Sequence, residues 1–276
     1  MALRLADIYE ELARMHREGI SGVLATVVRA DGSTPRNAGA KMIIYGDGRI
    51  LGSVGGGAIE STVINEARDM VGSKESRLFS YDLAADQGMT CGGGMDIFLE
   101  PIASGPMVVV IGGGHVGLAV ARAARQSGFR VTAVDDRAEM VEAKRFPFAD
   151  SRLVGIEGLL ENELKVDGET LVVVVTRGHR FDKDWVKKLL GRKPAYLGML
   201  GSEKKVGKAF AELEAEGVPR ADLETVHAPI GLDIGAETPD EIAVSVMAEI
   251  IAVKHGIRDT AKLMDKIGFK GRDRNQ

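Results

Sequence analysis

Cys91 is the only cysteine in the chain, and it stands beside three consecutive glycines, Gly92, Gly93 and Gly94. A thiol on such a flexible backbone can receive hydrogen bonds from nearby amides, which favours the thiolate, the form that attacks electrophiles or binds a soft metal. The alternative is a small buried cysteine with no chemistry. We therefore take Cys91 as the candidate catalytic and metal-contacting residue.

Two further segments carry groups that suit an anion. Residues 31–39 offer the hydroxyl of Ser33, the rigid ring of Pro35 and the guanidinium of Arg36, and residues 52–60 place Gly55, Gly56 and Gly57 at the expected start of a helix. Backbone amides at a helix start and an arginine side chain both bind phosphate or carboxylate. The two segments could clamp an anionic ligand; alternatively, they are two well-formed turns.

A third glycine-rich segment matches the pattern G-x-G-x-x-G at Gly112, Gly114 and Gly117. It follows an apolar run and precedes a helical pattern, and Asp135 and Asp136 end the next expected strand, at about the distance of a ribose-binding acid. This arrangement predicts a site for NAD(P) or another nucleotide. The alternative is a Rossmann-like fold that binds no nucleotide.

Other polar residues follow the later apolar strands. His179 comes after the strand at 171–175, and Lys204 and Lys205 come after the strand near 195–200. Ligands bind at the carboxyl ends of strands in open α/β sheets, so His179 could contact a ligand or transfer a proton, and either lysine could meet phosphate. The alternatives are a solvated histidine and an ordinary helix start.

The elements that must position these residues divide into two patterns. Residues 1–103 mix helices expected at 4–18 and 58–70 with strands and hairpins, which indicates an α+β domain. A linker is expected within residues 101–106. From 104 to 276, apolar strands alternate with helices, which predicts a Rossmann-like parallel sheet covered on both faces. The fold class is therefore α/β, with two domains.

Composition excludes several classes of protein. The formal net charge is −4 and aromatic residues make up only 5%, so the sequence offers neither the basic surface nor the stacking platforms of a nucleic-acid-binding protein. Its apolar runs are far shorter than the roughly 20 residues of a membrane span. A lone cysteine and an early charged N-terminus favour the cytoplasm over secretion.

The ordered set of motifs resembles the XdhC/CoxI family, accessory factors for xanthine dehydrogenase and related molybdenum hydroxylases. The matching stretches extend over most of the chain from about Leu5 to Val253. They are residues 32–36, 52–57, 91–94, 112–117, 177–179, 201–205 and 229–235. The resemblance implies an XdhC-type N-terminal domain followed by a Rossmann domain. It also implies that the functional residues include Ser33, Pro35, Arg36 and Cys91.

The resemblance implies that the chain binds molybdenum cofactor (molybdopterin), supports its sulfuration and delivers it to a xanthine dehydrogenase-type hydroxylase. A cysteine desulfurase is a second candidate partner, and we expect a homo-oligomer. This chaperone interpretation is favoured over two rivals. One is an NAD(P)-dependent oxidoreductase that uses His179 or Cys91, and the other is a nucleotide-sensing regulatory module.

Overall fold

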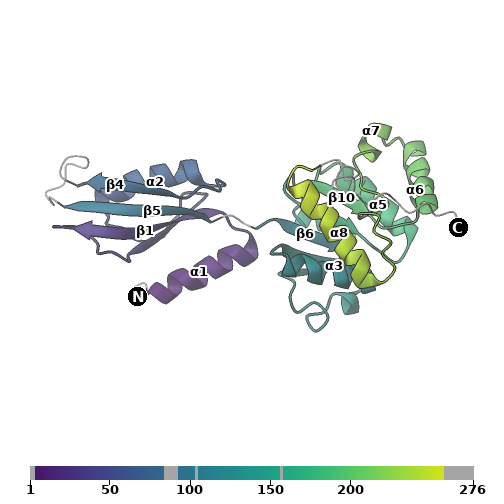
Figure 1. Ribbon diagram of the computed structural model, residues 1–276, viewed down its shortest axis with the longest axis horizontal. Helices are drawn as coiled ribbons and strands as arrows, with labels where there is room; N and C mark the ends of the chain where they lie inside the picture. Colours follow the sequence, from purple (N-terminus) through teal and green to yellow (C-terminus); the bar gives the residue numbers. More distant parts are fainter. Residues whose placement is uncertain (1–3, 84–92, 103–104, 156–157, 258–276) are drawn as a thin grey trace. The chain divides into compact units, whose positions relative to one another are not determined.

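The computed structural model describes residues 4–83, 93–102, 105–155 and 158–257 of the 276-residue chain (Figure 1). The side chains of residues 179–180 are also outside this description. The chain divides into two compact units, Met1–Gly105 and Pro106–Gln276. Each unit has hydrophobic cores of its own, and each is described by itself.

The N-terminal unit is a five-stranded antiparallel sheet with one helix on each face. Its elements are α1 (Leu5–Glu18), β1 (Gly22–Asp31), β2 (Lys41–Tyr45), β3 (Ile50–Gly52), α2 (Gly57–Met70), β4 (Arg77–Asp82) and β5 (Gly94–Ile102). The strand order is β3-β2-β1-β5-β4. Alternation along β2 explains the two faces, because Ile44 packs with the residues of α2 whereas Ile43 packs with those of α1.

Strand β5 is longer than the sequence pattern indicated. A linker was expected at residues 101–106, but β5 continues to Ile102 and Pro101 pairs with Val23 of β1. Pairing of β4 with β5 ends at Leu99, so Pro101 lies where this side of β5 has no partner among the described residues. A strand tolerates proline at such an edge, since the missing N–H removes no ladder hydrogen bond.

The C-terminal unit is a five-stranded parallel sheet in the order β10-β9-β6-β7-β8. Its main elements are β6 (Met107–Ile111), α3 (His115–Gln126), β7 (Arg130–Asp135), β8 (Ser151–Val154), β9 (Leu171–Val174), α5 (His179–Leu190), β10 (Tyr196–Met199), α6 (Glu203–Ala215) and α8 (Pro239–Lys254). Shorter helices are η1 (Ala138–Met140), α4 (Leu159–Asn162) and α7 (Arg220–Leu223). This doubly wound topology confirms the predicted Rossmann-like fold.

Helices cover both faces of this parallel sheet. On one face α3 and α8 lie side by side against the core that contains Val110 and Phe129 (Figure 1). On the other face α5 and α6 pack over the core that contains Trp185 and Leu213. A capping box starts α8, with the Thr238 hydroxyl accepting from the Glu241 amide at 3.3 Å. Within the described residues, no helix is long and apolar enough to span a bilayer.

Candidate functional site

The first two polar loops of the N-terminal unit lie in direct contact. The Pro35 ring packs on the backbone of Gly55, where a Cβ would lie only 2.9 Å from the Pro35 Cγ atom. Gly55 also has a φ of 159° and could not carry a larger side chain without moving the loop. The loop that carries Ser33 and Arg36 therefore meets the glycine turn that begins α2.

The third segment meets the same loop through Gly93. A Cβ on Gly93 would lie 2.5 Å from the carbonyl oxygen of Asp31 and 2.6 Å from that of Ser33, so only glycine fits there. Gly93 also accepts a backbone hydrogen bond from Leu83 at 3.0 Å. Cys91 and Gly92 lie outside the described residues, and Cys91 precedes Gly93 by two positions. The described parts of the three segments therefore lie in contact, Gly55 with Pro35 and Gly93 with Asp31 and Ser33.

An ion-pair cluster fixes the start of the Ser33 loop. The Arg29 guanidinium binds Asp96 of β5 at 2.7 Å and Asp31 at 2.8 Å. The hydrogen bonds that Asp96 accepts from Arg29 and, to a lesser extent, from Ser80 lower the pKa of Asp96 below its ordinary value. Asp31 is the last residue of β1, directly before the loop that carries Ser33. The cluster therefore joins the start of this loop to β5, which begins directly after Gly93.

The glycine turn before α2 is occupied by an internal carboxylate. Glu60 accepts hydrogen bonds from the Ser53 hydroxyl at 2.5 Å and from the Gly55 amide at 3.4 Å. Burial raises the pKa of Glu60, but the hydrogen bonds from Ser53 and from the amides of Gly56, Gly55 and Val54 outweigh it, so its pKa lies below the ordinary value. The turn does bind an anion, and in this structure that anion belongs to the protein.

Replacing Glu60 by alanine is expected to loosen this turn. The amides of Val54, Gly55 and Gly56 would lose their acceptor, at a cost of about 1–3 kcal/mol. Hydrogen exchange should accelerate at these amides, and calorimetry should show a weaker N-terminal unit. The control is Glu75→Ala, which removes an exposed carboxylate. Equal effects of the two changes would contradict this role of Glu60.

The C-terminal unit uses its fingerprint glycines for close packing. A Cβ on Gly117 would lie 1.8 Å from the carbonyl oxygen of Gly112, and one on Gly112 would lie 2.3 Å from that of Val175. Gly114 differs, because a Cβ there would have no atom within 4 Å. The start of α3 at Gly114 is therefore the open point of this turn.

Asp135 is already satisfied within the protein. Its carboxylate accepts from the Gly113 amide at 2.7 Å, and from the amide and Nε of Arg137 at 3.0 Å each. Burial raises the pKa of Asp135, but these hydrogen bonds lower it by more, so the net shift is downward. The Met140 backbone packs against Gly113, where a Cβ would lie 2.4 Å from the Met140 carbonyl oxygen. The Asp135 carboxylate is therefore held in place by donors of the protein itself.

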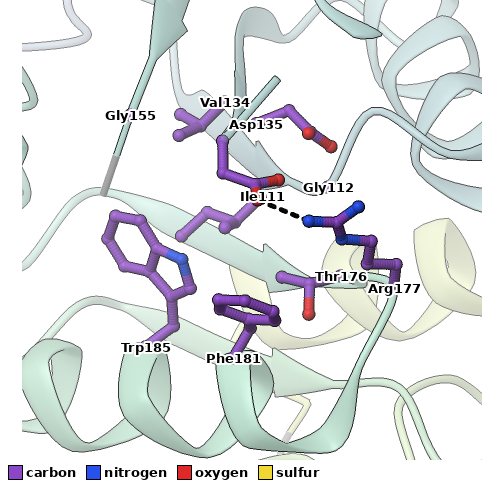
Figure 2. A pocket seen from close by; sticks show the side chains of 10 residues that line it. Ile111, Gly112, Val134, Asp135, Gly155, Thr176, Arg177, Phe181 and Trp185 are labelled. Carbon is purple, nitrogen blue, oxygen red and sulfur yellow. Dashed lines mark hydrogen bonds and ion pairs between the residues drawn. The ribbon is translucent and has the colours of Figure 1, made fainter.

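Arg177 lines the adjoining pocket together with Phe181 and Trp185 (Figure 2), and Asp136 lines it too. The ion pair of Asp136 with Arg177, at 3.0 Å, joins the carboxyl ends of β7 and β9 across β6, beside the rings of Phe181 and Trp185. The cavity beneath it is about 10 Å³, which is the room for roughly one water molecule. His179 begins α5, but its side chain is not among those described. Lys204 and Lys205 are exposed in the first turn of α6.

Two glutamates that make several polar contacts each were not predicted from the sequence. Glu60 lies in the first turn of α2, where an acid is a usual partner of free amides, so the sequence did carry a signal. The other is the buried Glu249, which contacts Tyr196 and His227. These residues are far apart in the sequence, and no local pattern joins them.

Two family matches cover most of the chain. Residues 15–82 match the XdhC and CoxI family, and residues 108–250 match the XdhC Rossmann domain. The second match alone spans more than half of the chain. The two matches follow the chain order of the antiparallel and parallel sheets.

Curated relatives and a solved structure agree with these matches. The uncharacterized protein YqeB of Escherichia coli K12 is 35% identical over 90% of this chain, which spans only 46% of that relative. A Bacillus subtilis 168 protein described as a probable subunit of xanthine dehydrogenase is 23% identical, covering 84% of this chain and 93% of the relative. The molybdenum cofactor insertion chaperone PaoD of E. coli K12 is 26% identical, covering 86% and 84% respectively.

The fold recurs in a crystal structure described as a xanthine dehydrogenase from Bacillus halodurans. That structure superposes with a TM-score of 0.51 at 19% identity, covering 92% of this chain and 96% of the other. At this identity the likeness concerns the fold alone. With both family matches in chain order, the protein belongs to the XdhC and CoxI family.

Proposed function

We propose that this protein is a chaperone for molybdenum cofactor. The observation that carries the proposal is the meeting of the Ser33–Arg36 loop, the turn at Gly55 and the segment at Gly93 in one place. The PaoD relative, whose name describes insertion of molybdenum cofactor, supports the same conclusion. The site has the form of an open surface built from loops rather than a closed cage, which suits cargo that must be released.

The residues of the site suit this cargo chemically. Molybdenum cofactor is a pterin with a terminal phosphate, and its two sulfur atoms hold the metal. Arg36 is exposed and suits the phosphate, because a guanidinium donates two hydrogen bonds to phosphate oxygens. Cys91, as thiolate, suits the metal or an incoming sulfur. The cofactor is cargo here, and Cys91 is its proposed soft contact.

Delivery and sulfuration form the finer part of the proposal. The protein holds the cofactor while sulfide replaces one oxo ligand of the metal, and that oxygen leaves as water. It then passes the cofactor to a xanthine dehydrogenase-type hydroxylase. A cysteine desulfurase is the class of partner that would supply the sulfur as a persulfide, and a thiol reductant would release it as the sulfide that enters.

Anaerobic isolation tests the proposal. The full chain, produced in cells that make the cofactor, should carry molybdenum together with a pterin that becomes fluorescent on oxidation. Adding it to an apo-hydroxylase should restore activity. Isolation without either component, under conditions that load a known carrier, would contradict the proposal.

The contact at Cys91 has its own test. Cys91→Ser should lower retained molybdenum by about tenfold, because a hydroxyl is a poor ligand for a soft centre. The control is Thr90→Ser, which changes the neighbouring residue and leaves the thiol in place. A Cys91→Ser protein that retains and delivers the cofactor normally would remove the thiolate role.

A further inference from the structure

An open groove of about 690 Å³ lies in the N-terminal unit, bounded by residues of α1, β2 and β3. Its volume falls in the range of about 300–1,000 Å³ that is usual for small-molecule sites. Apolar side chains of Leu5, Ile8, Ile50 and Leu51 form part of its wall. A flat heterocycle could rest against such a surface.

The groove is also cationic. Arg4, Arg36 and Lys41 line it, and none of the described residues that line it is Asp or Glu. Arg4 is neutralised by Asp7 at 2.8 Å. The Lys41 ammonium bonds only the neutral Thr26 hydroxyl, at 3.0 Å, among described partners. Arg36 has no hydrogen-bond or ion-pair partner within the described part of the chain. Two positive charges therefore remain without a counter-charge among the described residues.

The groove adjoins the turn where the motifs meet. Gly52 and Ser53 line it. The Ser53 hydroxyl donates a hydrogen bond to Glu60, whose carboxylate also accepts hydrogen bonds from the backbone amides of the glycine turn. A second anion placed on those amides would be repelled by the Glu60 carboxylate. An anionic ligand at this site must therefore be held by other donors, and Arg36 and Lys41 line the groove without a counter-charge among the described residues.

We propose that this groove takes the phosphate-bearing pterin, with the phosphate held by Arg36 and Lys41 and the ring lying along the apolar wall. The assignment rests on the proposed function and names a subsite for its cargo. Glu60 then acts as a positioning residue: it fixes the glycine turn and directs the external anion into the groove. Glycine amides, in this account, do not hold the ligand.

Direct binding of a pterin tests the groove. The probe is the phosphorylated, oxidised fluorescent pterin derived from the cofactor, compared with the same compound after phosphatase treatment. The full-length protein should bind the phosphorylated form about tenfold more tightly, as expected for charge-assisted contacts. Inorganic phosphate should compete, and added salt should weaken the preference.

Variants assign the preference to named side chains. Arg36→Gln and Lys41→Gln should each weaken binding of the phosphorylated probe several-fold, and the double variant should bind both probes equally. Arg17→Gln is the matched control, because Arg17 is exposed on α1 and does not line the groove. Lys41→Arg should largely retain the preference, which separates lost charge from disturbed folding.

The outcomes separate this inference from the proposed function. Equal binding of the two probes by the unmodified protein, or an undiminished preference in the double variant, would overturn the groove assignment. If molybdenum still copurifies in that case, the chaperone function stands without the groove. If the preference follows Arg36 and Lys41 but no molybdenum copurifies, the groove stands and the cargo is wrong.

Discussion

Replacing Gly117 by alanine is expected to destabilise the C-terminal unit by about 3 kcal/mol or more. The new Cβ would lie 1.8 Å from the carbonyl oxygen of Gly112 and 3.2 Å from Val175 Cγ2. Neither the turn after β6 nor the first turn of α3 can yield without losing backbone hydrogen bonds. The helix must therefore move away from the sheet that it covers.

Fluorescence of Trp185 gives a clean measurement of this effect. Trp185 is the only tryptophan in the chain and is buried in the core of the C-terminal unit, so a urea titration followed at this residue reports that unit alone. Gly114→Ala is the matched control, because it adds the same methyl group to open space three residues earlier. Similar urea midpoints for the two variants would contradict the close packing described here.

Replacing Glu249 by alanine is expected to cost the same unit about 3 kcal/mol. The carboxylate accepts from the Tyr196 hydroxyl at 2.5 Å and from the Gly231 amide at 2.9 Å, and it lies 3.2 Å from His227 Nδ1. Its removal leaves the buried Tyr196 hydroxyl and the half-buried His227 ring and Gly231 amide without this partner. It also frees the segment at Gly231, which the carboxylate joins to α8.

The effect of Glu249 should depend on pH. Burial raises its pKa, but hydrogen bonds from His227, Tyr196 and Gly231 lower it by more, so its pKa in the folded protein is below the ordinary value. Such a group stabilises the fold fully above its unfolded pKa, and this contribution disappears as the pH falls through the folded pKa. The difference in free energy of unfolding between the unmodified protein and Glu249→Gln should therefore decrease below about pH 4.5.

Trp185 fluorescence also serves here, with urea titrations at neutral pH and in steps toward about pH 3.5, below the ordinary pKa of a glutamate. Glu161→Ala is the control, because Glu161 is an exposed helical glutamate of the same unit. A difference that stays constant over this range would show that the charge of Glu249 is not what stabilises the cluster. A negligible effect of Glu249→Ala at neutral pH would contradict the contacts themselves.

The sequence predicted the C-terminal fold well because its signals are local. The apolar strand at Met107–Ile111 and the glycine turn that follows it each lie within a few residues, and each formed as expected. The parallel order of the strands then follows from the alternation of strands and helices. The end of β5 was misjudged, because whether Pro101 fits depends on how far β4 extends beside it.

Around the candidate site the sequence indicated close approaches of the backbone but not the partner of each polar group. Glycine clusters indicated close approach, and Gly93 and Gly55 do approach the Ser33 loop. A pattern of glycines could not show which anion the amides bind, and here Glu60 takes that place. Likewise, the position of Asp135 suggested a ribose contact, whereas Gly113 and Arg137 already satisfy it.

If the cofactor is held where the N-terminal motifs meet, substitutions at two neighbouring glycines should affect its retention differently. A Cβ on Gly93 would meet the Asp31 and Ser33 carbonyl oxygens, whereas the nearest atom to one on Gly94 is 3.8 Å away. Gly93→Ala and Gly94→Ala proteins would be isolated anaerobically as full chains, checked for folding, and assayed for molybdenum and pterin per chain. Folded Gly93→Ala protein should lose most of its cofactor, while Gly94→Ala protein should retain it. Equal cofactor content in both folded variants would show that the cofactor is not held where these motifs meet.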